Sequence, residues 1–264
     1  MKLGAFGLGN MGAAFVGGVI RGGVVAPQDV FGFDPWSEAG QGLELQRMAS
    51  AREAAAASDV WLLAVKPAGI AGLLDDVRDQ ASGEVLVISV AAGVPLSTLV
   101  AHAPEGALVV RVMPNLAASK GASATGWVAS RAVSEEERSR INTMLSSVGV
   151  AIELADEEQL HAFTAAVGSG IAYLFLAAEA IADGAVAEGL PRPIARQVAA
   201  AAITGAGALL EGGAQSPAEL KDRVCSPGGT TIEGIVALER SGVRAAFVNA
   251  VREAARRSRE LARK

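Results

Sequence analysis

The chain has 264 residues, of which 51% are hydrophobic and 19% are charged, and its formal net charge is −5. This composition excludes a disordered chain, and the acidic balance argues against nucleic acid or an anionic membrane as the main partner, because both present phosphate groups. One cysteine (Cys225) and two histidines exclude an internal disulfide and leave little material for a zinc site, so we predict no metal. We expect a cytoplasmic, globular protein of about two domains.

We also expect no signal peptide and no membrane-spanning segment. Glycines at positions 7, 9 and 12 interrupt the apolar N-terminal segment, which is not typical of a signal peptide. The longest uncharged stretch, Ala162–Ala178, consists mostly of small residues. It therefore favours a closely packed helix over a span of about 20 strongly apolar residues.

Residues 1–155 alternate strand and helix patterns, which predicts an α/β domain with an open, doubly wound, Rossmann-type sheet. Apolar runs typical of strands are at Lys2–Gly7, Val30–Phe33, Val60–Val65, Val85–Val90, Leu108–Met113, Ala122–Val128 and Val150–Leu154. Helices are predicted at Met11–Arg21, Ser37–Met48, Pro67–Asp79 and Leu96–His102, and from the capping-box sequence at Ser134. We expect this domain to bind a dinucleotide.

Residues 156–264 carry only helical patterns. The predicted helices are Glu157–Ala187, with breaks allowed at its glycines, Pro193–Leu210, Pro217–Val224, Thr231–Arg240 and Val243–Ala262. Alanine and glycine dominate here and large aliphatic residues are few, so the helices can build only a small core of their own. We therefore predict an all-helical dimerisation and substrate-binding domain that buries its apolar faces against a second copy of the chain.

The sequence Gly7-Leu8-Gly9-Asn10-Met11-Gly12 fits the dinucleotide fingerprint G-x-G-x-x-G and lies between a predicted strand and a predicted helix. In that motif the first glycine permits a tight turn, the second lets the pyrophosphate approach the backbone, and the third lets the helix pack on the strand. The N–H groups at the helix start then favour the phosphates. A glycine-rich turn without a ligand is the alternative, but the strand–turn–helix context favours dinucleotide binding.

Asp34 ends the second predicted strand, about 20 residues past the glycines, where an acidic side chain accepts the ribose hydroxyls of a cofactor. A carboxylate there favours NADH over NADPH, because it would repel a 2′-phosphate. The alternative is a turn role, which Asp34-Pro35 also suits. We predict NADH or NADPH as the cofactor, with Asp34 favouring NADH.

Three further segments follow predicted parallel strands, at the sheet edge where ligands bind in this fold. They are Val65-Lys66-Pro67, Ala92-Gly93 and Asn115. We predict that they line the cofactor site, with Asn115 bonded to the nicotinamide amide or to the substrate. Ordinary strand-to-helix turns, and an asparagine that bonds its own backbone, are the alternatives.

The segment Cys225-Ser226-Pro227-Gly228-Gly229-Thr230-Thr231 precedes a predicted helix and has Thr230 and Glu233 at capping-box spacing. Backbone N–H groups at such a helix start would hold a carboxylate without a cationic side chain. From spacing alone, a tight helix–helix connection is an equal alternative. We expect Cys225 to pack beside this loop rather than to act as a nucleophile.

In these segments and several others, the sequence resembles the pyrroline-5-carboxylate reductases of proline biosynthesis, and the resemblance covers nearly its whole length. In the first half the matching segments are the glycine fingerprint, Ala64-Val65-Lys66-Pro67, Ile88–Gly93 and Arg111-Val112-Met113-Pro114-Asn115. In the second half they are Gly168-Ser169-Gly170, Ala172-Tyr173, Glu179-Ala180, Gly189–Arg192, Ser226–Thr231 and Ala250–Leu261. The serine–proline–glycine–glycine–threonine–threonine loop is specific to that family.

The resemblance implies reduction of the cyclic imine L-1-pyrroline-5-carboxylate to L-proline by NADH or NADPH. It also implies interlocked homodimers formed through the helical half, which in the family often assemble into larger rings. The residues that it assigns to the substrate are Ser226, Gly228, Gly229, Thr230 and Thr231. Among them, Thr231 would be the catalytic residue, hydrogen-bonded to the ring nitrogen, while backbone amides near Gly229 and Thr230 would hold the carboxylate.

Two segments depart from the family pattern: Ile171 stands where the family usually has proline, and Leu116-Ala117 stands where it usually has threonine-proline. Because both are near the expected nicotinamide pocket, a different cyclic imine, such as a six-membered ring, stays open. A second alternative is a 3-hydroxyacid dehydrogenase, which needs a general base such as Lys221. A third is a non-catalytic dimer that binds a nucleotide.

Overall fold

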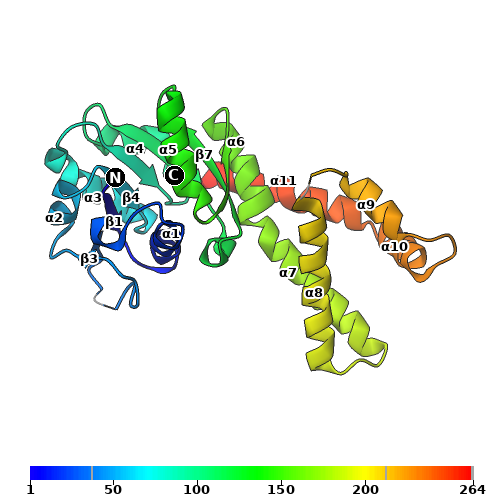
Figure 1. Ribbon diagram of the computed structural model, residues 1–264. Helices are drawn as coiled ribbons and strands as arrows, with labels where there is room; N and C mark the ends of the chain where they lie inside the picture. The colour runs from blue at the N-terminus through cyan, green and yellow to red at the C-terminus, as the bar shows by residue number, and fades with distance from the viewer. Residues whose placement is uncertain (37, 212, 263–264) are drawn as a thin grey trace. The chain divides into compact units, whose positions relative to one another are not determined.

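The seven predicted strands and one strand that was not predicted, β3, form a single eight-stranded sheet in the order β3-β2-β1-β4-β5-β6-β7-β8 (Figure 1). They are β1 (Leu3–Phe6), β2 (Val30–Phe33), β3 (Gln46–Arg47), β4 (Val60–Leu63), β5 (Leu86–Ser89), β6 (Leu108–Met113), β7 (Ser123–Ala129) and β8 (Gly149–Glu153). Neighbouring strands pair in parallel except β6 and β7, which are antiparallel. Only the short 3₁₀ helix η4 (Leu116–Lys120) separates these two strands, whereas a parallel pair needs a longer crossover.

Helices cover both faces of this sheet, which confirms the doubly wound α/β class (Figure 1). They are α1 (Asn10–Arg21), α2 (Ala51–Ala56), α3 (Ile70–Val77), α4 (Leu96–His102) and α5 (Glu135–Ser146), with short 3₁₀ turns η1 (Pro27–Asp29), η2 (Pro67–Gly69) and η3 (Arg78–Gln80). On one face α1 and α5 pack on residues such as Leu62, and on the other α2, α3 and α4 pack on residues such as Trp61. All four residues of β4 are buried, which explains the uninterrupted apolar run that predicts this strand.

The helix predicted over Ser37–Met48 is wrong. Ser37 lies outside the described residues, and the chain from residue 38 onward forms turns before it enters β3. Gly40 and Gly42 have φ values of +66° and +82°, which a right-handed helix does not allow. In place of that helix, the structure adds β3 and the short helix α2, whose N-cap hydroxyl on Ser50 accepts the Glu53 N–H.

The second half of the chain is helical, as predicted. Its helices are α6 (Glu157–Phe163), α7 (Gly170–Ala187), α8 (Arg192–Glu211), α9 (Pro217–Val224), α10 (Thr230–Arg240) and α11 (Val243–Ala262), with a π-helical turn, η5 (Thr164–Gly168), between α6 and α7. The break therefore falls at the glycines, where it was allowed. Helices α7 and α8 pack together through three buried alanines, Ala182, Ala195 and Ala199.

The computed structural model describes residues 1–36, 38–211 and 213–262. By internal contacts, one compact unit comprises Met1–Gly168 with Ala254–Lys264, and a second comprises Ser169–Glu253. The sheet lies wholly in the first unit, and α8, α9 and α10 lie wholly in the second. The functional division at residue 155, into a dinucleotide-binding and a dimerisation and substrate-binding domain, stays a prediction.

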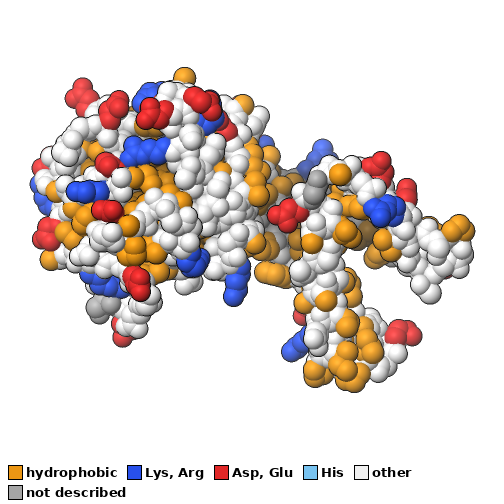
Figure 2. Space-filling model, in the orientation of Figure 1, with side chains coloured by type: hydrophobic (Ala, Val, Ile, Leu, Met, Phe, Trp, Pro, Cys, Tyr) orange, Lys and Arg blue, Asp and Glu red, His pale blue; other side chains and the backbone are white. Residues whose placement is uncertain are grey.

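Large apolar side chains lie exposed on the helices of the second unit. Phe175 and Leu176 of α7 and Leu209 of α8 are each more than half exposed, and Figure 2 shows hydrophobic side chains at the surface of this part of the chain. Two helical stretches, Glu157–Ala187 and Arg192–Glu211, are long and apolar enough to cross a membrane by length and composition alone, and few of their residues are buried. Exposed apolar patches of this kind mark surfaces that contact another protein or a membrane.

Candidate active site

The glycine turn between β1 and α1 is closed by protein on one side and open on the other. Gly7 has a φ of +91°, and a Cβ there would lie 2.7 Å from the carbonyl group of Ala64. A Cβ on Gly12 would lie 2.0 Å from the Gly7 carbonyl oxygen, so α1 begins in close contact with the turn. At Gly9, by contrast, a Cβ would meet no described atom within 4 Å. The open space at Gly9 is where the fingerprint would bring the pyrophosphate to the backbone.

The first turn of α1 has N–H groups to offer to such a ligand. Its N-cap is Gly9, and no side chain of the described residues caps the helix. Helices α2, α5 and α6 are instead capped by Ser50, Ser134 and Asp156. An uncapped first turn carries unpaired N–H donors and a partial positive charge, so α1 fits a pyrophosphate group.

Asp34 ties the end of β2 to the glycine turn. Its Oδ2 accepts the Leu8 N–H at 2.7 Å, and its Oδ1 accepts the Trp36 N–H at 2.9 Å. These bonds fix the position of the carboxylate, and each oxygen keeps a further lone pair for a ribose hydroxyl. The turn role and the ribose role considered for Asp34 are therefore compatible.

The other predicted cofactor segments lie at the same sheet edge, because β1, β4, β5 and β6 are adjacent and parallel. After β4, Val65 is half-buried, while Lys66 and Pro67 are exposed, and Lys66 serves as N-cap of η2. After β5, Ala92 is exposed and Gly93 has a φ of +78°. The fold thus brings these loops next to the glycine turn, and their contact with a cofactor stays a prediction.

Asn115, after β6, is held by several protein contacts. Its Oδ1 accepts the Ala117 N–H at 3.0 Å and so caps η4, while its Nδ2 donates to the Val167 carbonyl at 3.4 Å. Its own N–H donates to the Ser123 hydroxyl at 3.1 Å. The alternative in which Asn115 bonds the neighbouring backbone is therefore realised, and the second N–H of its amide is the group left for a ligand. Sequence reasoning missed Ser123, because no local pattern signals this support.

In the helical unit, residues 226–229 form a tight turn before α10. The Gly229 N–H donates to the Ser226 carbonyl at 3.0 Å, and Gly228 has a φ of +66°, a combination that proline at the second position and glycine at the third favour. A Cβ on Gly229 would lie 2.3 Å from the Ser226 hydroxyl oxygen. Only glycine therefore lets that hydroxyl lie beside the first turn of α10.

The capping box predicted from Thr230 and Glu233 is not formed. Helix α10 begins at Thr230, its N-cap is Gly229, and it has no side-chain cap in the part of the chain that the structure describes. Because Thr230 is the first helical residue rather than the N-cap, its hydroxyl is not in the position that accepts the Glu233 N–H in a capping box. The predicted capping box was therefore wrong. Its absence favours a ligand site, because the first-turn N–H groups stay available to an anion. The half-buried Thr231 is in the same turn.

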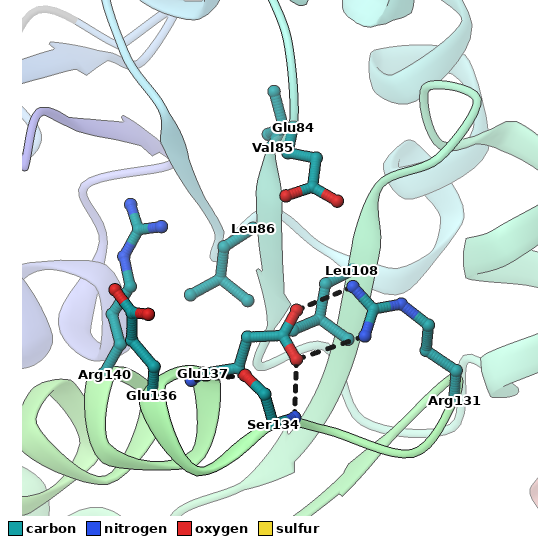
Figure 3. A pocket seen from close by; sticks show the side chains of 9 residues that line it. All are labelled: Glu84, Val85, Leu86, Leu108, Arg131, Ser134, Glu136, Glu137 and Arg140. Atoms are coloured by element: carbon teal, nitrogen blue, oxygen red, sulfur yellow. Dashed lines mark hydrogen bonds and ion pairs between the residues drawn. The ribbon is translucent and has the colours of Figure 1, made fainter.

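A separate pocket of about 350 Å³ lies where β5 and β6 begin, at the edge opposite to the glycine turn (Figure 3). Its central feature is Glu137, which receives two hydrogen bonds from Arg131 and one from the Ser134 N–H. Arg140, also in its wall, pairs with Asp59. Because these charged groups are already paired with one another, we interpret the pocket as the capped start of α5 rather than as a catalytic site. The capping box predicted at Ser134 is confirmed.

A Glu137→Gln variant is expected to unfold more easily, by about 1–2 kcal/mol at pH 7, since it loses a capping contact and an ion pair. The hydrogen bond from Arg131, followed by that from Ser134, lowers the pKa of Glu137 from 4.5 to about 2. A carboxyl whose pKa is lowered by folding stabilises the protein above its unfolded pKa, and this contribution is lost as the pH falls from about 4.5 to 2. Chemical unfolding followed from pH 7 to 3 measures it, with the exposed neighbour Glu136→Gln as control; equal acid sensitivity in both variants contradicts the prediction.

Two protein-family descriptions match the chain. "Pyrroline-5-carboxylate reductase dimerisation" matches residues 157–261, and "NADP oxidoreductase coenzyme F420-dependent" matches residues 2–93. The first match contains the turn before α10, and the second contains the glycine turn and Asp34.

Full-length relatives agree with these matches. The pyrroline-5-carboxylate reductase of Methanosarcina acetivorans is 40% identical, over 100% of this chain and 98% of its own. The structure of a pyrroline-5-carboxylate reductase from Coxiella burnetii superimposes with a TM-score of 0.93 at 30% identity and covers 98% of each chain. A Plasmodium falciparum pyrroline carboxylate reductase, solved with NADP bound, gives a TM-score of 0.86 at 28% identity and covers 99% of this chain and 98% of its own.

Proposed function

Because this chain belongs to the pyrroline-5-carboxylate reductase family, we propose that it reduces the C=N bond of L-1-pyrroline-5-carboxylate to give L-proline, with NADH or NADPH as the reductant. The observation that carries the proposal is the 40% identity with a reductase of that name over the full length of this chain. The open glycine turn and the uncapped start of α10 support it, because each suits an anionic group of one reactant.

We assign the dinucleotide to the glycine turn, where Gly7, Leu8, Gly9, Asn10, Met11 and Gly12 would surround its pyrophosphate. Asp34 would accept the ribose hydroxyls, while the loops that contain Val65, Lys66, Pro67, Ala92, Gly93 and Asn115 would line the rest of the cofactor. When bound, the reduced nicotinamide supplies the hydride. The protein's contribution is to hold both reactants at a reactive distance and to exclude water.

We propose NADH as the preferred form of the cofactor. The Asp34 carboxylate is fixed by the Leu8 and Trp36 N–H groups, so it cannot easily turn away from the 2′-phosphate of NADPH. The negative charges of the carboxylate and the phosphate would then repel each other. Arg47, a cation near this turn in the chain, already donates to the Ala39 carbonyl at 2.6 Å. The bound NADP in the Plasmodium falciparum relative makes the comparison of both forms the decisive measurement.

At the start of α10, we propose that backbone N–H groups near Gly229 and Thr230 hold the substrate carboxylate, with Ser226 and Gly228 shaping the turn. The Gly229 N–H itself is bonded to the Ser226 carbonyl, so the donors would be the N–H groups of the helix from Thr230 onward. The Thr231 hydroxyl would hydrogen-bond the ring nitrogen. A protonated imine already carries the positive charge that draws hydride to its carbon, so the site needs no strong acid. The sequence is consistent with a site that has no strong acid, because no charged side chain occurs in residues 226–231.

The contact of Lys221 argues against the dehydrogenase alternative. Its ammonium group pairs with Asp222 at 2.7 Å, and this hydrogen bond raises the pKa of Lys221 above its ordinary value. A lysine that takes a proton from an alcohol at neutral pH needs a lowered pKa instead.

A Thr231→Ala variant is expected to lower kcat by about 10- to 100-fold, because a hydrogen bond to a charged group is worth about 1.5–3 kcal/mol. The half-buried side chain should leave the thermal unfolding midpoint nearly unchanged. Thr231→Ser keeps the hydroxyl and should recover most of the rate in steady-state assays. Equal kinetics in Thr231→Ala and the wild type contradict the assigned role.

We also propose that the chain works in the cytoplasm as a homodimer, with larger rings of dimers as a further level. Among its described residues, the second unit buries only small alanines in its own core and exposes apolar faces on α7 and α8, which a second copy would cover as in an obligate interface. Sedimentation equilibrium without detergent should give twice the 26.7 kDa chain mass or a multiple. A chain that requires detergent to stay in solution contradicts this proposal.

The test of the whole proposal is a steady-state assay of five- and six-membered cyclic imino acids against both NADH and NADPH. We expect the highest kcat/KM with L-1-pyrroline-5-carboxylate and NADH. Faster turnover of a six-membered imine would move the assignment to the substrate alternative that Ile171 and Leu116-Ala117 leave open. Tight NADH binding without turnover of any imine would favour the non-catalytic dimer.

A further inference from the structure

The three tryptophans of the chain differ sharply in their exposure. Trp61 and Trp127 are 0% exposed, whereas Trp36 is 76% exposed. A large aromatic side chain in water forgoes the stabilisation that its burial would give, so an exposed tryptophan beside a ligand site calls for an explanation.

The backbone of Trp36 is anchored although its side chain is exposed. Its N–H donates to Asp34 Oδ1 at 2.9 Å, and its carbonyl accepts the Ala39 N–H at 3.0 Å. The same Asp34 carboxylate accepts the Leu8 N–H of the glycine turn. One side chain thus holds the glycine turn and the Trp36 backbone together, and the indole is presented from a fixed point at the ribose end of the dinucleotide site.

The covalent structure of a dinucleotide places its adenine ring next to the ribose that Asp34 would bind. The adenine ring is attached directly to the ribose whose hydroxyls Asp34 would accept, and two residues of extended chain span at most about 7 Å. An indole two residues past Asp34 is therefore within reach of that ring. Around it, Glu38, Gln41 and Glu44 are exposed and polar, so this segment does not form the apolar patch that marks a protein-docking surface.

We propose that Trp36 is the stacking surface for the adenine ring of the cofactor. This inference rests on the dinucleotide site of the proposed function and adds to it a residue that sets the affinity for the adenosine half. Stacking of a base on an aromatic side chain commonly changes affinity by about tenfold or more. Because NADH and NADPH share the adenine ring, Trp36 serves both, and the choice between them stays with Asp34.

The test compares wild type, Trp36→Phe and Trp36→Ala by calorimetric titration with NADH and with ADP-ribose, which keeps the adenine and lacks the nicotinamide. We expect Trp36→Ala to bind both ligands about tenfold more weakly, and Trp36→Phe to bind both within about threefold of the wild type. ADP-ribose should also quench the tryptophan fluorescence of the wild type, and this quenching should vanish in Trp36→Phe, whose two remaining tryptophans are buried.

Two controls separate this inference from a loss of structure and from the proposed function. The thermal unfolding midpoint should be the same in all three proteins, and kcat/KM with reduced nicotinamide mononucleotide, which has no adenine, should not change. Equal NADH affinity in wild type and Trp36→Ala overturns the inference, as does an equal loss with the mononucleotide. Absence of imine turnover in the wild type would refute the proposed function and leave the ADP-ribose titrations as a valid test of Trp36.

Discussion

A Gly9→Ala variant is expected to keep its fold and to bind NADH and NADPH about 10- to 100-fold more weakly. The methyl group would occupy the space through which the pyrophosphate reaches the first N–H groups of α1. Each hydrogen bond from such a group to a charged ligand is worth about 1.5–3 kcal/mol, and 1.4 kcal/mol corresponds to a factor of ten in affinity.

The fold should tolerate this change because no described residue opposes it. A Cβ on Gly9 meets no described atom within 4 Å, and its φ of −66° and ψ of −170° suit any residue. We therefore expect the free energy of unfolding to change by less than about 0.5 kcal/mol, as for an ordinary surface substitution.

Two other glycines serve as matched controls in calorimetric titration and thermal unfolding. At Gly12 an added Cβ would lie 2.0 Å from the Gly7 carbonyl oxygen, so Gly12→Ala should lose both stability and affinity. Gly72, exposed in α3 and free of close neighbours, should gain up to about 1 kcal/mol as alanine and bind normally. If Gly9→Ala binds like the wild type, the pyrophosphate does not approach the backbone at Gly9.

The glycine turn could be predicted from the sequence because its causes are local. A tight turn, a close approach and a helix start depend on residues within six positions of one another, and each needs a glycine for a steric reason. The same holds for the helix that begins at Ser134, where the cap and its acceptor are three residues apart. The doubly wound α/β class could also be predicted, because it follows from the alternation of strand and helix patterns along the chain.

The failures have equally physical causes. Over Ser37–Met48 a helical pattern was overridden by two glycines with positive φ, and at Thr230 the helix began one residue earlier than its apolar pattern indicates. Neither error changes the assigned site residues. What no local pattern reveals is a pairing between distant residues, and the clearest case joins Arg111 to Glu157.

Arg111 is a cation in the middle of β6 with its side chain only 3% exposed. Its Nη1 pairs with Glu157 at the start of α6, and its Nε finds no hydrogen-bond partner among the described residues. The same Glu157 oxygen, Oε1, also accepts the Leu96 N–H at 2.7 Å. The carboxylate thus neutralises a buried charge and joins the beginnings of α4 and α6 to the sheet.

A Glu157→Gln variant is therefore expected to lose about 3 kcal/mol of unfolding free energy, because it leaves the Arg111 charge buried without its counterion. Denaturant unfolding followed by the fluorescence of Trp61 and Trp127, both buried in the same unit, measures the loss. The neighbouring Glu158 pairs with Arg259 at the surface, with side chains 63% and 40% exposed, so Glu158→Gln should cost less than about 1 kcal/mol.

A double variant, Arg111→Met with Glu157→Leu, separates the buried charge from the packing of these side chains. Removal of both charges leaves no unpaired ion, so it should recover much of the stability lost in Glu157→Gln.

The consequence for function follows from position, since Arg111 is four residues before Asn115, whose amide donates to the Val167 carbonyl just beyond α6. Loosening α6 should therefore raise the KM for the dinucleotide in Glu157→Gln and leave it unchanged in Glu158→Gln; equal effects of the two substitutions on stability and KM would mean that Arg111 does not depend on Glu157.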